Sequence, residues 1–287
     1  MIRNAYLILA HNEWDLLNIL LSCLDDERND IYVHIDKKVG TLPELHTEKA
    51  GLKILENRVD VRWGDLSMVE AEYALFEEAI KKGGYDYYHL LSGVDLPLKS
   101  QDYIDDFLEK NNGKEFIGYT LTEITPEVVR KVRRWHLFPK DFRKKSGAKR
   151  IVRAGFLKIQ ELLGIERNKE IDFKKGSQWC SITEDMAKYF ISRKDWVMKV
   201  FRNTFCSDEI VMQTLCWESP YRKNIYCTTD DGRGCMRAIG WRNGELVDWC
   251  AKDYSMLCES DAIFARKFNS SDMSFIRRIT ELQQAHD

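Results

Sequence analysis

Two short apolar segments near the N-terminus predict buried strands of a parallel sheet. The first covers residues 5–10, and the second covers residues 31–36 and ends in an acid, Asp36. Between them, leucines recur at helical spacing from Leu16 to Leu24. A strand, a helix and a second strand in this order predict a parallel pair joined by a right-handed crossover.

The alternation of strands and helices continues further along the chain. Ile54 and residues 59–62 suggest a third strand, residues 69–82 predict a helix with one apolar face, and residues 115–119 suggest another strand. Such alternation over residues 1–120 predicts an α/β fold with a mostly parallel, doubly wound sheet. No internal repeat and no linker rich in proline or serine divides the chain, so we expect a single domain with an irregular C-terminal part.

One stretch, residues 87–100, links a predicted strand to a turn and then to a helix-like segment at residues 101–110. The strand passes into Ser92 and Gly93, and Asp95 follows at once. The carboxyl ends of parallel strands face a crevice, which favours a ligand contact for Asp95. An aspartate that caps the next turn is an equally good interpretation.

The composition is that of an ordinary soluble protein. Of 287 residues, 44% are hydrophobic and 31% are charged, which is enough apolar material for a core. The formal net charge of -2 indicates no general preference for polyanions. No apolar run approaches the roughly 20 residues that a membrane span needs. Since a strand-like segment begins almost immediately, we expect no signal peptide and a cytoplasmic protein.

The cysteines and the glycines exclude several common sites. None of the eight cysteines is arranged as Cys-x-x-Cys, so we expect reduced thiols and no zinc site. The chain contains neither Gly-x-Gly-x-x-Gly nor Gly-x-x-x-x-Gly-Lys-Ser/Thr. Neither a dinucleotide-binding loop nor a P-loop is therefore indicated.

Residues 130–153 form a basic window, with eleven lysines or arginines and one acid, Asp141. Aromatic residues, among them Trp135, are interleaved with these cations. The window could be a rim that meets an anionic acceptor or a membrane surface. A solvated helical face is the slightly favoured alternative, because basic surface runs are common. No nucleic-acid reader motif accompanies it.

Three later segments hold further candidates. Thr183 is typical of a helix N-cap, and so are Ser207 and Asp208, which precede Glu209 and an apolar helix. The two acids could also do no more than complement the helix dipole. Residues 237–241 suggest a short strand that leads into a loop. Residues 264–268, Phe-Ala-Arg-Lys-Phe, place two cations between aromatic anchors.

Together these segments resemble the branching β-1,6-N-acetylglucosaminyltransferases, a family that includes the core-2 and I-branching enzymes and is related to the peptide O-xylosyltransferases. Seven motifs occur in the family's order over roughly residues 4–269. They are residues 5–11, 32–36, 63–71, 89–100, 176–179 and 207–209, followed by Arg237 together with residues 264–268. The resemblance implies a GT-A-type fold and inverting transfer from a UDP-sugar. It makes residues 1–120 the nucleotide-sugar-binding half and residues 121–287 the acceptor-binding and catalytic half.

The resemblance also implies roles for single residues. Glu209 matches the catalytic base, although the proline of the family's Ser-Pro-Asp-Glu-like motif is missing here. Arg237 and Lys267 match the cations that meet the diphosphate, and Asp36 matches a uridine contact. We also expect donor contacts from His11, Trp63 and Asp95, and acceptor contacts from Arg134, Trp135, Trp179 and Asp208.

The chemistry of such a transfer agrees with this set. Inversion needs one base that takes the proton of the attacking hydroxyl, and a carboxylate suffices. The departing diphosphate needs its growing charge neutralised. No two aspartates of the chain are separated by one residue, so the Asp-x-Asp that holds a metal in most GT-A enzymes is missing. We therefore expect metal-independent transfer, with arginine and lysine in place of the ion and no cofactor.

The resemblance leaves the substrates open. N-acetylglucosamine is the expected sugar, and a xylosyl or other UDP-sugar transferase is the alternative on the same scaffold. A non-catalytic glycan-binding protein is the alternative from another class. Without the membrane anchor and luminal cysteines of the animal enzymes, the chain is similar to a stand-alone bacterial catalytic domain. We expect it to act on an oligosaccharide or lipid-linked acceptor in surface polysaccharide synthesis, with possible peripheral contact to an anionic membrane and none to nucleic acid.

Overall fold

A six-stranded sheet lies at the centre of the molecule. The computed structural model describes residues 2–120, 122–143 and 147–283. The strands of the sheet are β1 (Asn4–Ala10), β2 (Asn29–Ile35), β3 (Gly51–Ile54), β4 (Tyr87–Ser92), β6 (Phe116–Ile117) and β7 (Cys180–Thr183). Their order is β3-β2-β1-β4-β7-β6. The first four run parallel, and β7 runs antiparallel to both of its neighbours. The predicted α/β fold with a mostly parallel sheet is confirmed.

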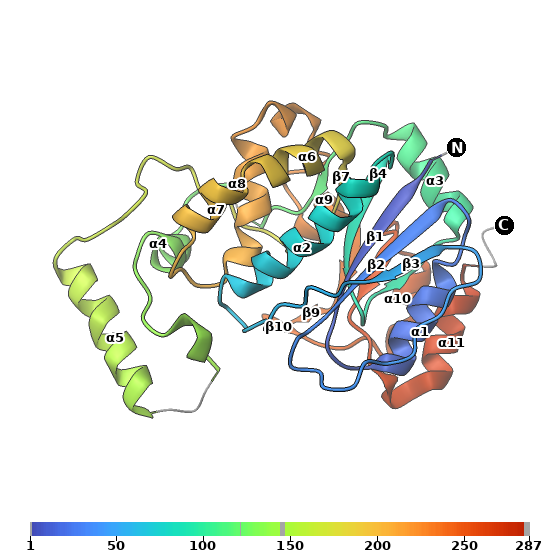
Figure 1. The fold of residues 1–287 in the computed structure, drawn as a ribbon, viewed down its shortest axis with the longest axis horizontal. Coiled ribbons are helices and arrows are strands. Elements are labelled where there is room, and N and C mark those ends of the chain that lie inside the picture. The colour runs from blue at the N-terminus through green and yellow to red at the C-terminus, as the bar shows by residue number, and fades with distance from the viewer. Residues whose placement is uncertain (1, 121, 144–146, 284–287) are drawn as a thin grey trace.

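Helices cover both faces of this sheet (Figure 1). One face carries α1 (Trp14–Cys23), α3 (Gln101–Lys110), α10 (Tyr254–Cys258) and α11 (Met273–Glu281). The other carries α2 (Ser67–Lys82), α4 (Pro126–Val132), α6 (Glu184–Ser192), α7 (Lys194–Val200) and α8 (Val211–Trp217). Strand β1 serves both layers, because Tyr6 and Ile8 pack with the first group while Leu7 and Leu9 pack with the second. This alternation is the period of two that a strand imposes on its side chains.

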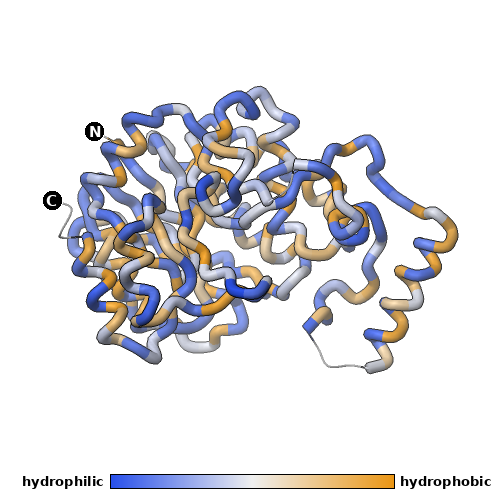
Figure 2. The backbone as a smooth tube through the Cα atoms, turned by 180° about the vertical axis from the view of Figure 1, so that it is seen from behind, coloured by the Kyte–Doolittle hydropathy of each residue, from blue (hydrophilic) through white to orange (hydrophobic). Residues whose placement is uncertain are grey.

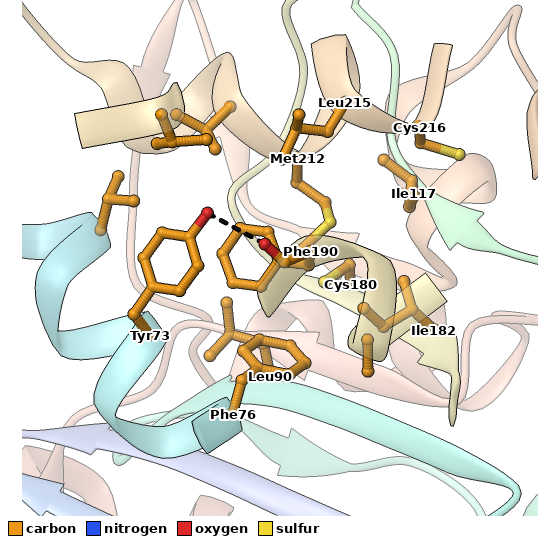
Figure 3. Packing of buried hydrophobic residues seen from close by; sticks show 14 of the residues in the cluster. Tyr73, Phe76, Leu90, Ile117, Cys180, Ile182, Phe190, Met212, Leu215 and Cys216 are labelled. Carbon is orange, nitrogen blue, oxygen red and sulfur yellow. Dashed lines mark hydrogen bonds between the residues drawn. The ribbon is translucent and has the colours of Figure 1, made fainter. Parts of the chain in front are cut away.

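The core beneath α2 is closed by stacked aromatic rings (Figure 3). The rings of Tyr73 and Phe190 lie 4.2 Å apart and nearly parallel, and the Tyr73 hydroxyl donates to the Phe190 carbonyl at 3.2 Å. Phe76 packs edge-on against Phe190. Aromatic pairs of this kind contribute about 0.5–1.5 kcal/mol beyond the burial of their area. They fix α2 and α6 against the sheet and so support one wall of the cleft described below.

Helices α1, α2 and α3 confirm the helices predicted from spacing, and Thr183 caps α6 as expected, through its side chain and the Met186 amide. The strand predicted at residues 59–62 was wrong, because the third strand ends at Ile54. The Val59 amide donates to His34 Nε2, and the Val59 carbonyl accepts from the Lys37 amide. Because of these bonds, residues 59–62 cross the end of β2 and do not pair alongside a strand.

Two small sheets complete the C-terminal part. Strands β5 (Leu96–Pro97), β11 (Phe264–Arg266) and β8 (Arg237–Ile239) form one, and β9 (Trp241–Arg242) and β10 (Glu245–Leu246) form the other. Short helical turns connect them to the rest: α9 (Asp231–Cys235), η1 (Pro139–Asp141), η2 (Ser207–Glu209), η3 (Pro220–Asn224), η4 (Ala251–Asp253) and η5 (Ser270–Asp272). Since β11 pairs with β5, the end of the chain is joined to the turn that follows β4.

Helix α5 (Gly147–Leu162) projects away from the body of the molecule (Figure 1). It belongs to the basic window, of which Lys144 and Lys145 lie outside the described residues. Within the described ranges, no helix combines the length and the apolar character needed to cross a membrane. All eight cysteines fall in these ranges, and none of them forms a disulfide.

Candidate active site

A cleft of about 1140 Å³ opens at the carboxyl ends of β1, β2 and β4. His11, Asp36 and Gly93 follow these strands directly and line it. Parallel strands bring their carboxyl ends to one edge of a sheet, so this is the position expected for a ligand site. The opposite wall comes from residues 175–179, η2 and the end of β11. Residues from both halves of the chain therefore face one space.

Asp36 is held in place at the first wall. Its amide donates to the Ala10 carbonyl, and its carboxylate accepts from the backbone amide and the ammonium group of Lys38. His34 lies beneath it, and burial lowers the pKa of this imidazole below its usual value. A neutral His34 agrees with its acceptor role, since Nε2 accepts the Val59 amide. The carboxylate of Asp36 is thus oriented before any ligand binds.

Trp63 supplies an aromatic surface on the same wall. Its ring packs edge-on against Phe205, with centroids 5.4 Å apart, and the Arg143 guanidinium lies 4.8 Å above it. Both Trp63 and Arg143 line the cleft. An aromatic face with a cation beside it suits a planar or anionic ligand.

Glu209 stands on the opposite wall with two lysines. Its Oε2 is 3.0 Å from Lys131 Nζ and 3.8 Å from Lys175 Nζ. Burial alone would lower the pKa of Lys131, but the carboxylates of Glu209 and Glu127 raise it above its usual value. The same two lysines lower the pKa of Glu127 to about 2. The wall therefore holds fixed charges of both signs, with the Glu209 carboxylate still partly exposed to the cleft.

The backbone of η2 turns Asp208 and Glu209 toward the cleft. Cys206 adopts a left-handed conformation before η2, with φ 50°, and α8 begins only at Val211. The prediction that Ser207 and Asp208 cap this helix was wrong, because neither side chain accepts a hydrogen bond from its first turn. Instead, the Glu209 carbonyl accepts from the Gly176 amide at 2.9 Å. Gly176 itself has no room for a β-carbon, since Gly118 lies against it.

Asp208 has an unusual environment for a carboxylate. Burial, and then the charge of Glu209, raise its pKa to about 7. Its Oδ1 has no hydrogen-bond partner among the residues that the structure describes. Behind it, Glu72 is buried and accepts from Gln178 Nε2 at 2.6 Å, and burial raises the pKa of Glu72 well above its usual value. Asp208 is therefore a titratable group near neutrality with an unsatisfied oxygen at the cleft.

Arg266, at the end of β11, lies between a ring and a buried acid. Its guanidinium lies 4.1 Å over the Trp179 ring, and Nη1 is 3.9 Å from Asp95 Oδ1. Asp95 is 1% exposed, and its other oxygen accepts from the Ser92 amide. Burial raises the pKa of Asp95, although Arg266 opposes this shift. Arg266 therefore lines the cleft although it is only 8% exposed, whereas Asp95 is not among the lining residues.

Lys267 follows Arg266 and also lines the cleft, 2.9 Å from Asp248 through its ammonium group. The next residue, Phe268, donates its amide to the Val94 carbonyl. This bond ties the two cations to the turn after β4. Arg266 and Lys267 therefore place two adjacent positive charges at one end of the cleft, on a segment that this hydrogen bond holds in position.

The structure places the predicted site residues in two groups. Seven of them line the cleft: His11, Asp36, Trp63, Trp179, Asp208, Glu209 and Lys267. Four do not: Asp95, Arg134, Trp135 and Arg237. Asp95 accepts from the amide of Ser92, which precedes it, instead of capping the next turn. Trp135 stacks with Arg167 at 3.8 Å, and Arg134 donates to the Ile165 carbonyl, so both belong to the support of α5.

Arg237 is 2% exposed and belongs to a network inside the sheet. Its Nη2 donates to the Cys180 carbonyl and to Ser181 Oγ, both at 2.9 Å. Ser181 Oγ in turn bonds His89 Nδ1 at 2.7 Å. Arg237 borders a separate cavity of about 550 Å³ instead of the cleft. Of the cations considered, Arg266 and Lys267 line the cleft, whereas Arg237 does not.

Sequence reasoning passed over Arg266, Lys131 and Lys175 as site residues. The Phe-Ala-Arg-Lys-Phe segment indicated that one of its cations points inward, but the choice between them rests on how β11 pairs with β5 and β8. Lys131 belongs to the basic window, where spacing alone could not separate it from surface lysines. Within the described ranges, no cluster of three or more His, Cys, Asp or Glu side chains is arranged to hold a metal ion.

Comparison with known proteins agrees with this geometry. Residues 4–275 match the core-2/I-branching enzyme family. The chain belongs to this family. The matched range includes the motifs on which the resemblance noted in the sequence rests. The core-2/I-branching enzymes are glycosyltransferases. The mixed, mostly parallel sheet is consistent with the GT-A-like fold of the family.

Among curated proteins, this core-2/I-branching family member is similar to several xylosyltransferases. It is 22% identical to xylosyltransferase 2 of Rattus norvegicus over 94% of the chain and 32% of that protein. It is 22% identical to xylosyltransferase oxt of Drosophila pseudoobscura pseudoobscura over 87% of the chain and 29% of that protein. The chain thus spans about a third of the length of the curated relatives that it matches.

Proposed function

We propose that the chain is an inverting glycosyltransferase of GT-A type. It would transfer a sugar, N-acetylglucosamine as the first candidate, from a UDP-sugar to a hydroxyl of a glycan acceptor. One observation carries the proposal: the partly exposed carboxylate of Glu209 and the adjacent cations Arg266 and Lys267 line the same cleft. A base and a diphosphate site are the two features that such a transfer needs.

The donor fits the wall formed by the strand ends. Asp36, with its carboxylate already oriented, suits the hydrogen-bond donors of a nucleoside, and Trp63 and Arg143 offer a surface for a planar base. His11 lies beside Asp36 on the same wall. With the nucleoside here, the diphosphate would extend toward Arg266 and Lys267.

The two cations suit the leaving group. Arg266 offers a planar fork of donors and Lys267 a compact charge, and both geometries match phosphate oxygens. Arg266 has little conformational freedom, because Trp179 stacks on it and Asp95 lies behind it. A cation that is already in place costs no reorganisation as the bond to the diphosphate breaks. We therefore propose that these residues neutralise the leaving group without a metal ion.

Glu209 would take the proton from the acceptor hydroxyl as that oxygen attacks the anomeric carbon. Lys131 and Lys175 hold its Oε2, which leaves Oε1 for the acceptor. Trp179 and Asp208 lie on the same wall and would contact the acceptor sugar. The acceptor itself would be an oligosaccharide or lipid-linked glycan of surface polysaccharide synthesis in the cytoplasm of a bacterium.

Xylose is the second candidate for the transferred sugar, because the curated relatives reported above are xylosyltransferases. Release of UDP from a panel of UDP-sugars, with and without glycan acceptors, distinguishes the two. Release that depends on both a UDP-sugar and an acceptor supports transfer. Tight glycan binding with no UDP release from any donor would indicate a binding protein instead.

The same assay tests the metal. We expect unchanged UDP release in EDTA, since fixed cations replace the ion. Loss of activity in EDTA that manganese restores would contradict this part of the proposal while leaving the transfer itself intact.

A further inference from the structure

Helix α5 carries an apolar stripe that faces away from the protein. The stripe consists of Ile151, Val152, Gly155, Ile159 and Leu162, which recur at intervals of three and four residues. All five are exposed, and Ile151 and Leu162 are 73% and 75% exposed. Leu163, just after the helix, is 68% exposed. The tube in Figure 2 shows hydrophobic positions recurring along this projecting helix.

The opposite side of α5 attaches it to the molecule. Leu157 and Gln160 are buried there, and the Gln160 side chain makes two hydrogen bonds of 2.9 Å to the backbone of Trp135. Arg153 lies 5.0 Å over the Phe142 ring. The orientation of the helix is thus set by specific contacts, and these contacts leave the stripe outward. Contiguous apolar surface of this kind marks an interaction site.

Positive charge surrounds the stripe. Helix α5 contains four cations, Lys149, Arg150, Arg153 and Lys158, and a single acid, Glu161. Lys158 lies beside the apolar positions and Arg150 lies near the N-terminal end of the helix, and both are exposed. An apolar face with basic flanks on a helix too short and too polar to span a bilayer is typical of helices that lie in a membrane interface. Anionic headgroups complement these flanks.

We propose that α5 docks the protein on an anionic lipid bilayer, with the stripe inserted among the acyl chains and Arg150 and Lys158 among the headgroups. A second copy of the chain fits less well. Two α5 helices packed together would each carry four cations and one acid, and this like net charge opposes association. The proposal goes beyond the transfer reaction, because α5 contributes no residue to the lining of the cleft.

Docking would also bring the cleft close to the membrane. Phe142 contacts Arg153 of α5 and packs against Phe205 with centroids 4.5 Å apart, and Phe205 packs against Trp63 of the cleft. These side chains connect the helix to the cleft wall by direct contacts. An acceptor carried on a lipid would meet the enzyme at this position.

Flotation with lipid vesicles tests the docking. The full chain is mixed at low salt with phosphatidylcholine vesicles that contain or lack phosphatidylglycerol, with no glycan and no UDP-sugar present. We expect binding to the anionic vesicles that exceeds binding to neutral ones by about tenfold or more. Ile151→Asp with Leu162→Asp should lose this binding, since it places charge in the acyl region.

Two further variants control for charge and folding. Leu42→Asp with Met256→Asp makes the same chemical change at exposed positions outside α5 and should bind as the native chain does. Arg150→Gln with Lys158→Gln should keep the fold and lose the preference for anionic lipid. Equal binding by the two aspartate variants would overturn the proposal, and so would a native chain that stays unbound at low salt. The proposal would also fail if the native chain bound no vesicles and light scattering showed it to be a dimer that Ile151→Asp with Leu162→Asp dissociates.

Discussion

Asp95 with Arg266 and Glu209 with Lys131 are two carboxylate–cation pairs at the same cleft, and opposite members of the two pairs line it. In the first pair both side chains are buried, and it is the cation Arg266, 8% exposed, that lines the cleft. In the second pair the cation is mostly buried and the acid is exposed to the cleft. In each pair, the member that does not line the cleft lies next to the member that does. Under the proposed transfer, the first pair would offer a cation to the leaving group and the second a carboxylate to the acceptor proton.

The largest effect is expected where the exposed carboxylate loses its charge. Glu209→Gln keeps the shape of the side chain but cannot accept a proton. Turnover should fall by about 10²–10⁴-fold, the usual contribution of a general base. UDP-sugar binding, measured by calorimetry, should stay near that of the native enzyme, because the donor wall is unchanged. Near-normal turnover in this variant, with a severe loss in Asp208→Asn, would move the base to Asp208.

The cation of the other pair, Arg266, should come next. Arg266→Gln removes charge stabilisation of the departing diphosphate and should lower kcat by about 10²–10³-fold. Arg237→Gln is the matched comparison, since that side chain lies in the sheet and not in the cleft; it should lower the melting temperature with far less effect on kcat per folded molecule. The opposite ranking of the two arginines would contradict the geometry described above.

The smallest effect concerns pH and stability, and it tests Asp208, whose pKa is raised to about 7 from an ordinary value of 3.8. Between these values the folded protein holds a proton that the unfolded chain releases. Stability should therefore fall as pH rises through this window. Asp208→Asn removes the titration. The melting temperature of this variant should therefore rise relative to that of the native protein between about pH 4 and 7, and the difference should stay constant above pH 7. Parallel melting curves over this range would show that Asp208 titrates normally.

Much of the scaffold follows from local pattern. Alternation in β1 and helical spacing in α2 are strong because each element is buried along its length, and the strand ends place His11 and Asp36 at one edge. The cations could not be assigned in this way. Arg237 and Arg266 lie on the same face of one small sheet, at opposite ends of the paired strands β8 and β11, and local pattern alone does not show that only Arg266 lines the cleft. Asp208 was misjudged as a cap for a related reason, since a left-handed Cys206 turns it out of the helix.

The pairing of β11 with β5 has a consequence for synthesis of the protein. The strand ends of the donor wall exist once residue 93 has been made, but the cations at residues 266 and 267 follow only after most of the chain has been translated. Until then β5 has no partner strand. The cleft also lacks these two positive charges and the segment that carries them. The N-terminal half should therefore not act as a separate donor-binding module. A ribosome-bound intermediate should remain unable to hold a nucleotide sugar until its last strand is in the sheet.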